Sequence, residues 1–247
     1  MSGKEMNTAQ SLIADLRKRF AAERRLGGSF RPDCLKIEAD GALILEGEVD
    51  RVGQKKIALE VAAAHPGIDA IIDRLHVRPA EQLSDAAIRM RLREAYARDP
   101  SLAGLSITET TGAATSRNIS QPDNETGTLE YAVSDGIVTL NGSTSDLAIK
   151  RYIGVLAWWI PGTRDVINGI VAASDETDGP DRIADAVRVV LEKDPYIDAA
   201  QVKVGVRLRT VRLTGMLPTA EQARMAENDA WYVFGVDDVL NEIVTPD

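Results

Sequence analysis

The residues of this chain whose types and spacing suit chemistry are recurring cations and aromatic rings. Lys56, Arg151 and Arg224 lie at equivalent positions of three similar segments, and Trp158 and Trp231 share another such position. Cations on one helix face suit phosphate headgroups or an acidic partner, although a solvated helix face has the same pattern. Exposed aromatic rings anchor partners or membrane interfaces, whereas buried rings pack against a sheet or a neighbouring repeat. These five residues are candidate contacts, with both interpretations open.

A second group of cations lies near the N-terminus. Residues 16–31 hold six Lys and Arg side chains against Glu23 alone, although the whole chain carries a net charge of −9. That net charge argues against general binding to nucleic acid and repels anionic lipid. Binding to an anionic membrane would therefore need a local patch, and Arg17, Lys18 and Arg24 are the candidate headgroup contacts. The Debye length is about 8 Å at physiological ionic strength, so we expect such binding to weaken steeply with salt.

No residue is predicted to catalyse a reaction, to bind a cofactor or to hold a metal ion. Cys34 is the single cysteine, and no Cys/His cluster has the spacing of metal ligands. His65 ends a helical segment and fits a structural role. Gly-rich phosphate loops, Gly-x-Ser-x-Gly elbows and paired-carboxylate motifs do not occur. The sequence therefore predicts a protein that is not an enzyme.

Three repeats must position these side chains. A pair of glycines twenty residues apart occurs three times, as Gly47 and Gly67, Gly142 and Gly162, and Gly215 and Gly235. A matching frame of apolar residues surrounds each pair, which indicates three tandem copies of one small unit. The copies are predicted at residues 7–78, 84–172 and 180–245.

Each copy is predicted to run helix, strand, strand, helix, strand. Apolar residues alternate with a period of two before the first glycine of each pair, which predicts a half-buried strand. Small residues four apart follow on an amphipathic helix, at Ala58 and Ala62 in the first copy. The fold class is α/β, an α+β sandwich of three small units, each with a three-stranded sheet backed by two helices on one face.

Local signals distinguish the copies. Asp135-Gly136 predicts a tight hairpin turn in the second copy, and the third copy lacks that pair. In the first copy the alternating apolar residues of the first strand are out of phase with the other copies, so its hairpin needs another loop length. The second glycine of each pair is predicted to adopt a left-handed conformation at a helix end. The second copy also carries a polar insertion at about residues 105–128. Its composition favours a disordered excursion, and residues 105–110 alternatively form an extra strand.

The motifs together resemble the BON domain. They are Asp-Pro after the first helix, at Asp99-Pro100 and Asp194-Pro195, then the strand of residues 135–142, and residues 235–243 in the third copy. The first copy departs from the pattern with Asp73 in place of Asn. The resemblance covers nearly the whole chain. It implies a small α/β sandwich without catalytic residues, and a binding role at phospholipid or envelope surfaces, often under osmotic stress.

Several functions agree with that resemblance. The leading prediction is a non-enzymatic binding protein whose partner is a phospholipid membrane surface or another protein. The alternatives are a stress-linked scaffold or chaperone-like module, and a sensor of a small ligand or an ion such as potassium, without membrane contact. No stretch reaches the roughly 20 apolar residues of a membrane span, and the N-terminus lacks the apolar core of a signal peptide. We therefore expect a cytoplasmic protein, or a periplasmic one if a leader was removed.

Overall fold

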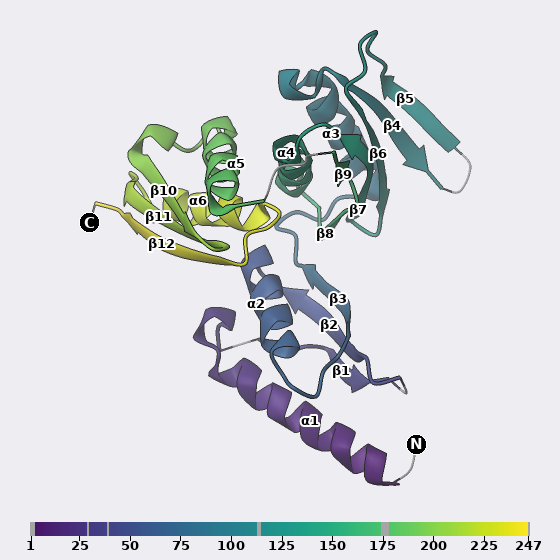
Figure 1. Cartoon of the computed structure of the whole chain (residues 1–247), viewed down its shortest axis with the longest axis vertical. Helices are drawn as coiled ribbons and strands as arrows, with labels where there is room; N and C mark the ends of the chain where they lie inside the picture. The colour runs from purple at the N-terminus through teal and green to yellow at the C-terminus, as the bar shows by residue number, and fades with distance from the viewer. Residues whose placement is uncertain (1–2, 29, 39, 113–114, 174–177, 247) are drawn as a thin grey trace. The chain divides into compact units, whose positions relative to one another are not determined.

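The computed structural model describes residues 3–28, 30–38, 40–112, 115–173 and 178–246. The chain forms two compact units, Met1–Arg78 and Pro79–Asp247 (Figure 1). The first unit contains repeat 1, and the second contains repeats 2 and 3.

Repeat 1 has the predicted order of elements. Its elements are α1 (Gly3–Ala22), the short 3-10 helix η1 (Arg24–Leu26), β1 (Cys34–Ile37), β2 (Leu43–Val49), α2 (Val52–Ala63) and β3 (Ile71–Val77). The sheet order is β1-β2-β3, with β2 antiparallel to β1 and parallel to β3. Leu16 and Phe20 of α1 are buried together with Leu43, Leu45 and Leu75 of the sheet. These side chains form a core between the helices and the sheet.

Repeat 3 has the same topology. Its elements are α5 (Pro180–Lys193), the short 3-10 helix η3 (Ala199–Gln201), β10 (Val202–Arg207), β11 (Thr210–Met216), α6 (Ala220–Tyr232) and β12 (Asp238–Val244). The sheet order is β10-β11-β12. Val211 and Leu213 are fully buried, whereas Arg212 between them and Leu240 on β12 are exposed. The two helices therefore cover one face of the sheet and leave the other face open, as predicted.

Repeat 2 carries a larger sheet than predicted. Its elements are α3 (Asp85–Arg98), the short 3-10 helix η2 (Pro100–Leu102), β4 (Leu105–Thr111), β5 (Thr115–Ser120), β6 (Gly127–Ser134), β7 (Ile137–Thr144), α4 (Leu147–Trp159), β8 (Asp165–Asn168) and β9 (Val171–Ala172). The six strands run β5-β4-β6-β7-β8, with β9 also paired to β7. The units thus share a core topology but not a uniform three-stranded sheet.

The insertion forms two of these strands. The interpretation of the insertion as a disordered excursion is wrong, and the alternative of an extra strand is confirmed, although residues 113–114 lie outside the described part. The reason is that β4 has an inward face, with Leu105, Ile107 and Glu109 buried. The Glu109 carboxylate accepts hydrogen bonds from Arg93 of α3 at 2.8–3.0 Å and from the Tyr131 hydroxyl at 2.8 Å. This buried charge is therefore paired, and it fixes the added strand to the repeat.

The three hairpins differ as the sequence predicts. Asp135 and Gly136 have φ of 54° and 74°, which a two-residue turn with positive φ at both positions requires. In repeat 3 Leu208 occupies the first turn position with φ of 56°, and Arg209 does not have positive φ. In repeat 1 Ile37 pairs with Leu43, so its loop is longer.

The left-handed conformation predicted for the second glycine of each pair occurs in two repeats out of three. Gly162 and Gly235 have φ of 90° and 95°, whereas Gly67 does not have positive φ. The predicted position of these glycines at the end of a helix is wrong. The helices α4 and α6 end before them, and the backbone is already extended at Ile160 and Val233. The glycines shape the turn that leads into the next strand. In repeat 1 the His65 ring accepts a hydrogen bond from the Gly67 amide at Nδ1, at 3.0 Å, and that turn needs no left-handed residue.

In every repeat, one polar contact joins the second helix to the strand that follows it. Asn168 and Asn241 donate from Nδ2 to the carbonyl oxygens of Lys150 and Ala223, at 3.0 and 2.9 Å. Repeat 1 has Asp73 at this position, and an ionised carboxylate cannot donate. There Lys55 supplies the donor, with Nζ 2.7 Å from the Leu75 carbonyl oxygen and 3.0 Å from Asp73. The departure from the family pattern is therefore compensated.

Candidate anion-binding site

A cavity of about 330 Å³ in repeat 1 brings three cations and two aromatic rings together. Arg17 and Lys18 come from α1, and Arg31 follows the loop after η1, while Phe20 and Phe30 supply apolar surface. The helix creates this placement because Leu16 and Phe20 lie four residues apart and turn inward. Arg17 and Lys18 then remain exposed beside them. The two Phe rings pack edge to face, with centroids 5.4 Å apart.

Within the described part of the chain, no carboxylate forms an ion pair with the cations of this cavity. Among the described residues, Arg17, Lys18 and Arg31 form no ion pair, and the Arg31 guanidinium donates to the Phe30 carbonyl oxygen at 2.7 Å. Neighbouring cations differ, because Arg19 pairs with Asp15 at 2.8 Å and Arg25 pairs with Glu23 at 3.0 Å. We therefore call Arg17, Lys18 and Arg31 the cation triad.

The paired carboxylates stay ionised, which keeps their partners neutralised. The hydrogen bond from Arg19 lowers the pKa of Asp15, and the hydrogen bonds from Arg25 lower the pKa of Glu23. The cation triad consequently carries the unbalanced positive charge of this surface. Its side chains can attract a phosphate group, and the Phe rings beside them suit the apolar part of the same ligand.

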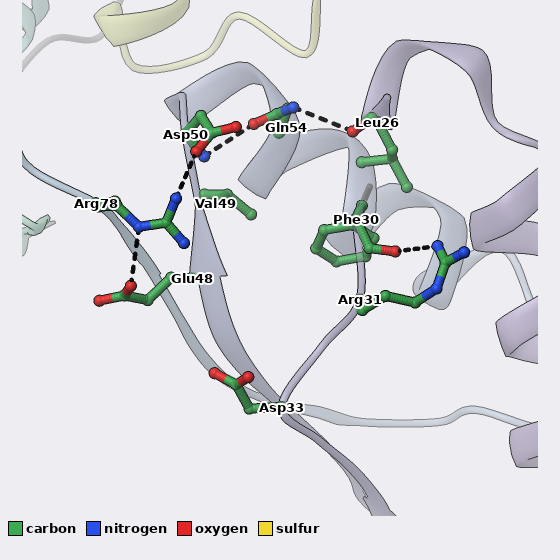
Figure 2. Close-up of a pocket in the computed structure, with 9 residues that line it drawn as sticks. All are labelled: Leu26, Phe30, Arg31, Asp33, Glu48, Val49, Asp50, Gln54 and Arg78. Carbon is green, nitrogen blue, oxygen red and sulfur yellow. Dashed lines mark hydrogen bonds and ion pairs between the residues drawn. The ribbon is translucent and has the colours of Figure 1, made fainter. Parts of the chain in front are cut away.

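A second cavity, of about 240 Å³, is also lined by Phe30 and Arg31 but has a different character, because Asp33, Glu48 and Asp50 line it as well. Figure 2 shows the Arg78 guanidinium between Glu48 and Asp50, at 3.2 and 3.0 Å, and the Arg31 guanidinium directed away from them. Gln54 accepts from the Asp50 amide at 2.9 Å and donates to the Leu26 carbonyl oxygen at 3.0 Å. Because carboxylates match the Arg78 charge, this cavity does not favour an anion.

The sequence identified part of the site. Arg17 and Lys18 are brought together at the cavity, whereas Arg24 is exposed in η1 and does not line it. Arg31 belongs to the basic segment of residues 16–31, but it is not among the headgroup contacts predicted from the sequence. The signal that could have identified it is its position directly after Phe30, which places a cation beside a buried ring.

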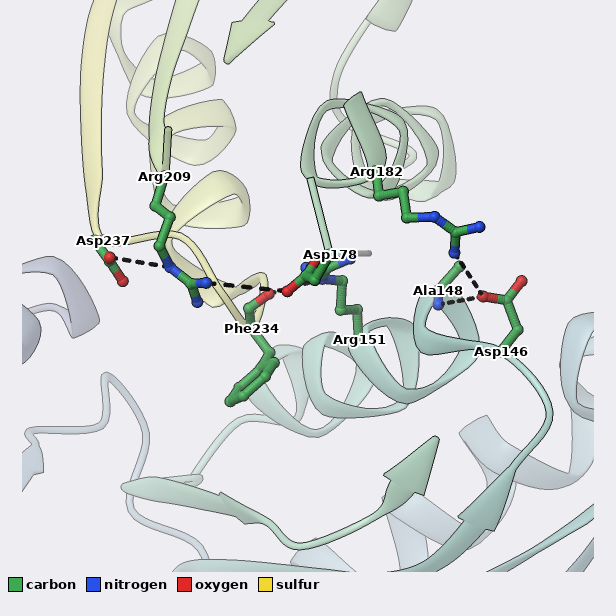
Figure 3. Close-up of polar contacts among 8 residues, drawn as sticks. All are labelled: Asp146, Ala148, Arg151, Asp178, Arg182, Arg209, Phe234 and Asp237. Carbon is green, nitrogen blue, oxygen red and sulfur yellow. Dashed lines mark hydrogen bonds and ion pairs between the residues drawn. The ribbon is translucent and has the colours of Figure 1, made fainter. Parts of the chain in front are cut away.

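The aligned cations of the second helix have three different environments. Lys56 is half-buried and Arg224 is exposed. Arg151 is 1% exposed, and its guanidinium donates from Nε to the Phe234 carbonyl oxygen at 2.8 Å and pairs with Asp178 at 2.5 Å (Figure 3). The prediction of Arg151 as a headgroup contact is corrected, because repeat 3 covers it.

The aligned tryptophans are not exposed rings, and Trp158 lies in the contact between repeats 2 and 3. Trp231 is 4% exposed, and the half-buried Trp158 ring stacks on Tyr232 of repeat 3 with centroids 5.6 Å apart. Trp159 donates from Nε1 to Asp229 of α6 at 2.8 Å. Of the two interpretations, packing against a neighbouring repeat describes Trp158. Trp231 is not presented as a surface anchor, which corrects that prediction.

The fold defines a protein of three tandem α/β sandwich units. The model of the BON domain matches residues 8–79, 115–174 and 180–247, so the chain belongs to the BON domain family. The match to repeat 2 begins after α3 and β4, where the insertion separates the first helix from the rest of the repeat. BON domains are in general non-catalytic binding domains.

Two solved structures that match are of CdsD, a structural protein of the type III secretion system of Chlamydia trachomatis. The first, of its C-terminal domain, is 15% identical with a TM-score of 0.25 and covers 96% of this chain and 98% of that chain. The second is also 15% identical, with a TM-score of 0.24 and coverage of 96% and 92%. Such scores support no conclusion about this chain. No curated protein sequence matches it.

Membrane-crossing helices and metal-binding clusters are both absent from the described residues. No helix there combines the length and apolar composition that a membrane crossing needs. In the same part of the chain, no group of three or more His, Cys, Asp or Glu side chains is arranged to hold a metal ion.

Proposed function

We propose that this protein is a non-enzymatic binding protein that associates with anionic phospholipid surfaces through the cation triad of repeat 1. The observation that carries the proposal is the set of three cations, unpaired among the described residues, beside the rings of Phe20 and Phe30. Each cation near an anionic surface contributes roughly 1 kcal/mol. The triad therefore supports weak, reversible association with a headgroup phosphate, while the Phe rings accept the apolar region next to it.

The overall charge shapes this proposal. The net charge of −9 repels an anionic membrane, so repeat 1 must approach with its basic surface first. Attraction of this kind is screened within about 8 Å at physiological ionic strength. Binding should therefore be strong in low salt and weak in high salt, and absent from vesicles of purely zwitterionic lipid.

The experiment is co-sedimentation of the full chain with vesicles of phosphatidylcholine, with and without phosphatidylglycerol, at low and high salt. The test variant combines Arg17→Gln, Lys18→Gln and Arg31→Gln. The control variant combines Lys36→Gln, Arg74→Gln and Arg212→Gln, whose cations are exposed and already paired with Glu38, Glu46 and Glu242. Both variants remove three positive charges, so they change the net charge equally and differ in where those charges lie and in whether they are paired.

We expect the wild type and the control variant to sediment with anionic vesicles at low salt and the test variant to remain in solution. Thermal melting of all three proteins checks that each is folded. The proposal is overturned if the wild type does not sediment at low salt, or if the control variant loses as much binding as the test variant. In the first case, a protein partner becomes the better hypothesis.

A further inference from the structure

Repeat 3 carries a surface groove of about 600 Å³ between the turn that follows α5 and the N-terminal part of α6. Its lining residues are Pro195, Tyr196, Thr219, Glu221, Gln222 and Met225. Tyr196 is 68% exposed, and its carbonyl oxygen accepts a hydrogen bond from Gln222 Nε2 at 2.9 Å. The turn is therefore tied to the helix, while the Tyr196 side chain remains accessible to a ligand.

Repeat 2 has the same combination of turn and helix. In both repeats an Asp-Pro pair follows the first helix. Asp99 and Asp194 each accept a hydrogen bond at Oδ1 from the amide two residues further along, at 2.8 Å in both cases. Tyr152 of α4 and Met225 of α6 are equivalent, because each directly follows the aligned arginine of its helix. The two repeats therefore place equivalent residues beside the second helix.

In repeat 2 a lysine of the neighbouring repeat occupies the equivalent place. Lys193 is the last residue of α5, and its Nζ donates to Ser101 Oγ at 3.2 Å and lies 3.6 Å from the Asp99 carboxylate. The same Nζ lies 5.4 Å from the centroid of the Tyr152 ring. Because the face of an aromatic ring attracts a cation, a carboxylate, a hydroxyl group and a ring together hold this lysine.

The groove of repeat 3 offers a ring and a carboxylate from exchanged positions. Tyr196 is at the position of Ser101, so the ring comes from the turn, whereas the Glu221 carboxylate comes from the helix. Glu221 is exposed and forms no ion pair with any described residue. Pro195 and Met225 add apolar surface, on which the methylene groups of a lysine can pack.

The charge of the groove favours a cation. Of the described residues that line it, Glu221 alone is charged. The N-terminus of α6 is the positive end of a helix dipole and opposes a cation. That effect is offset, because Thr219 accepts from the Gln222 amide at 3.2 Å and Glu221 lies in the first turn. An anionic headgroup would meet the Glu221 carboxylate, so this groove does not suit the lipid proposed for the cation triad.

We propose that this groove binds a lysine of a partner protein, presented in the last turn of a helix as α5 presents Lys193 to repeat 2. The ammonium group pairs with Glu221 and lies over the Tyr196 ring, and the methylene groups pack on Pro195 and Met225. This partner differs from the lipid surface proposed for repeat 1 and does not depend on it. The groove and the cation triad share no residue and belong to different compact units.

The probe is a synthetic helical peptide, rich in alanine and glutamine, with a single lysine in its last turn and with both ends blocked. A second peptide has glutamine in place of that lysine. Each is titrated by NMR into the full chain as the wild type, Glu221→Gln, Tyr196→Ala and the control Glu192→Gln. Glu192 is a matched control, because its carboxylate is exposed on α5 of the same repeat but does not line the groove.

We expect the lysine peptide to shift the amide signals of Tyr196 and of residues 219–225 in the wild type. Glu221→Gln should weaken binding of this peptide about tenfold, through the loss of one charge-assisted hydrogen bond. Tyr196→Ala should also weaken it, because the ring face is lost. Glu192→Gln should bind as the wild type does. The glutamine peptide should bind the wild type and Glu221→Gln equally weakly, since the two changes remove the same contact.

Three results would overturn the proposal. They are no shifts in the groove, equal affinity of the wild type for both peptides, and a loss in Glu192→Gln as large as in Glu221→Gln. Sedimentation velocity of the full chain tests the other occupant, a second copy. Self-association that Glu221→Gln abolishes would assign the groove to that copy and would contradict the partner proposed here. Thermal melting checks that each variant is folded, and no loss of stability is expected for replacements of exposed side chains.

Discussion

Repeat 1 and the pair formed by repeats 2 and 3 use equivalent positions in opposite ways. Lys56 of repeat 1 is half-buried, whereas Arg151 at the same position of repeat 2 is enclosed by repeat 3 and ion-paired with Asp178. The cation triad of repeat 1 forms no ion pair among the described residues. Equivalent residues of the repeats therefore occupy the same place in the fold. Whether such a residue is exposed depends on whether a neighbouring repeat covers it.

The largest expected effect comes from Arg151→Met. Removing the guanidinium leaves Asp178 and the Phe234 carbonyl oxygen without their partner in a buried contact, which costs about 3 kcal/mol of unfolding free energy. Arg224→Met is the matched control, because Arg224 has the same repeat position but is exposed, and it should change stability by less than about 0.5 kcal/mol. Urea denaturation measures both. Equal losses would show that burial by repeat 3 does not distinguish these positions.

Gly235→Val should have the next largest effect. The residue has φ of 95°, which a β-branched side chain resists, and an added Cβ would lie 3.0 Å from Arg151 Nη2. The expected loss is about 1–3 kcal/mol. Gly205→Val in β10 is the control, because its Cβ meets nothing within 4 Å and its φ is not positive. Thermal melts that are the same for both variants would show that the turn geometry is not required.

The smallest expected effect on stability concerns the polar contact between the second helix and the strand that follows it, which differs between repeats. Lys55→Ala removes the donor to the Leu75 carbonyl oxygen and should cost about 1–2 kcal/mol. Adding Asp73→Asn should restore part of the loss, because an asparagine there can donate to the α2 backbone as Asn168 does to the Lys150 carbonyl oxygen in repeat 2. A double-mutant cycle by urea denaturation measures this coupling. Additive losses would mean that Lys55 does not substitute for the asparagine.

The sequence predicted the parts of the fold that local chemistry determines. Alternating apolar residues located the paired strands, and Asp135-Gly136 predicted a turn because glycine tolerates its positive φ. The strand β5 was missed because its residues are mostly exposed and polar, and pairing with β4 rather than burial holds them. Composition alone does not distinguish such a strand from a disordered loop.

The site was harder to predict than the fold. Arg17 and Lys18 were identified from charge density, which is a property of the sequence. Arg31 joins them only because Phe30 packs on Phe20 and brings the loop to the helix. For Arg151 and Trp231 the sequence left both interpretations open, because the alignment of repeats does not show which repeats contact each other.

We propose above that repeat 1 binds anionic lipid, whereas Arg151 and Trp158 of repeat 2 contact repeat 3 instead of a lipid surface. Hydrogen exchange of the full chain, measured by mass spectrometry with and without anionic vesicles at low salt, tests it most directly. The account predicts slower exchange in peptides that cover residues 14–36 and unchanged exchange in α4 and α6. Protection of α4 or α6 by the vesicles, with none in residues 14–36, would contradict it.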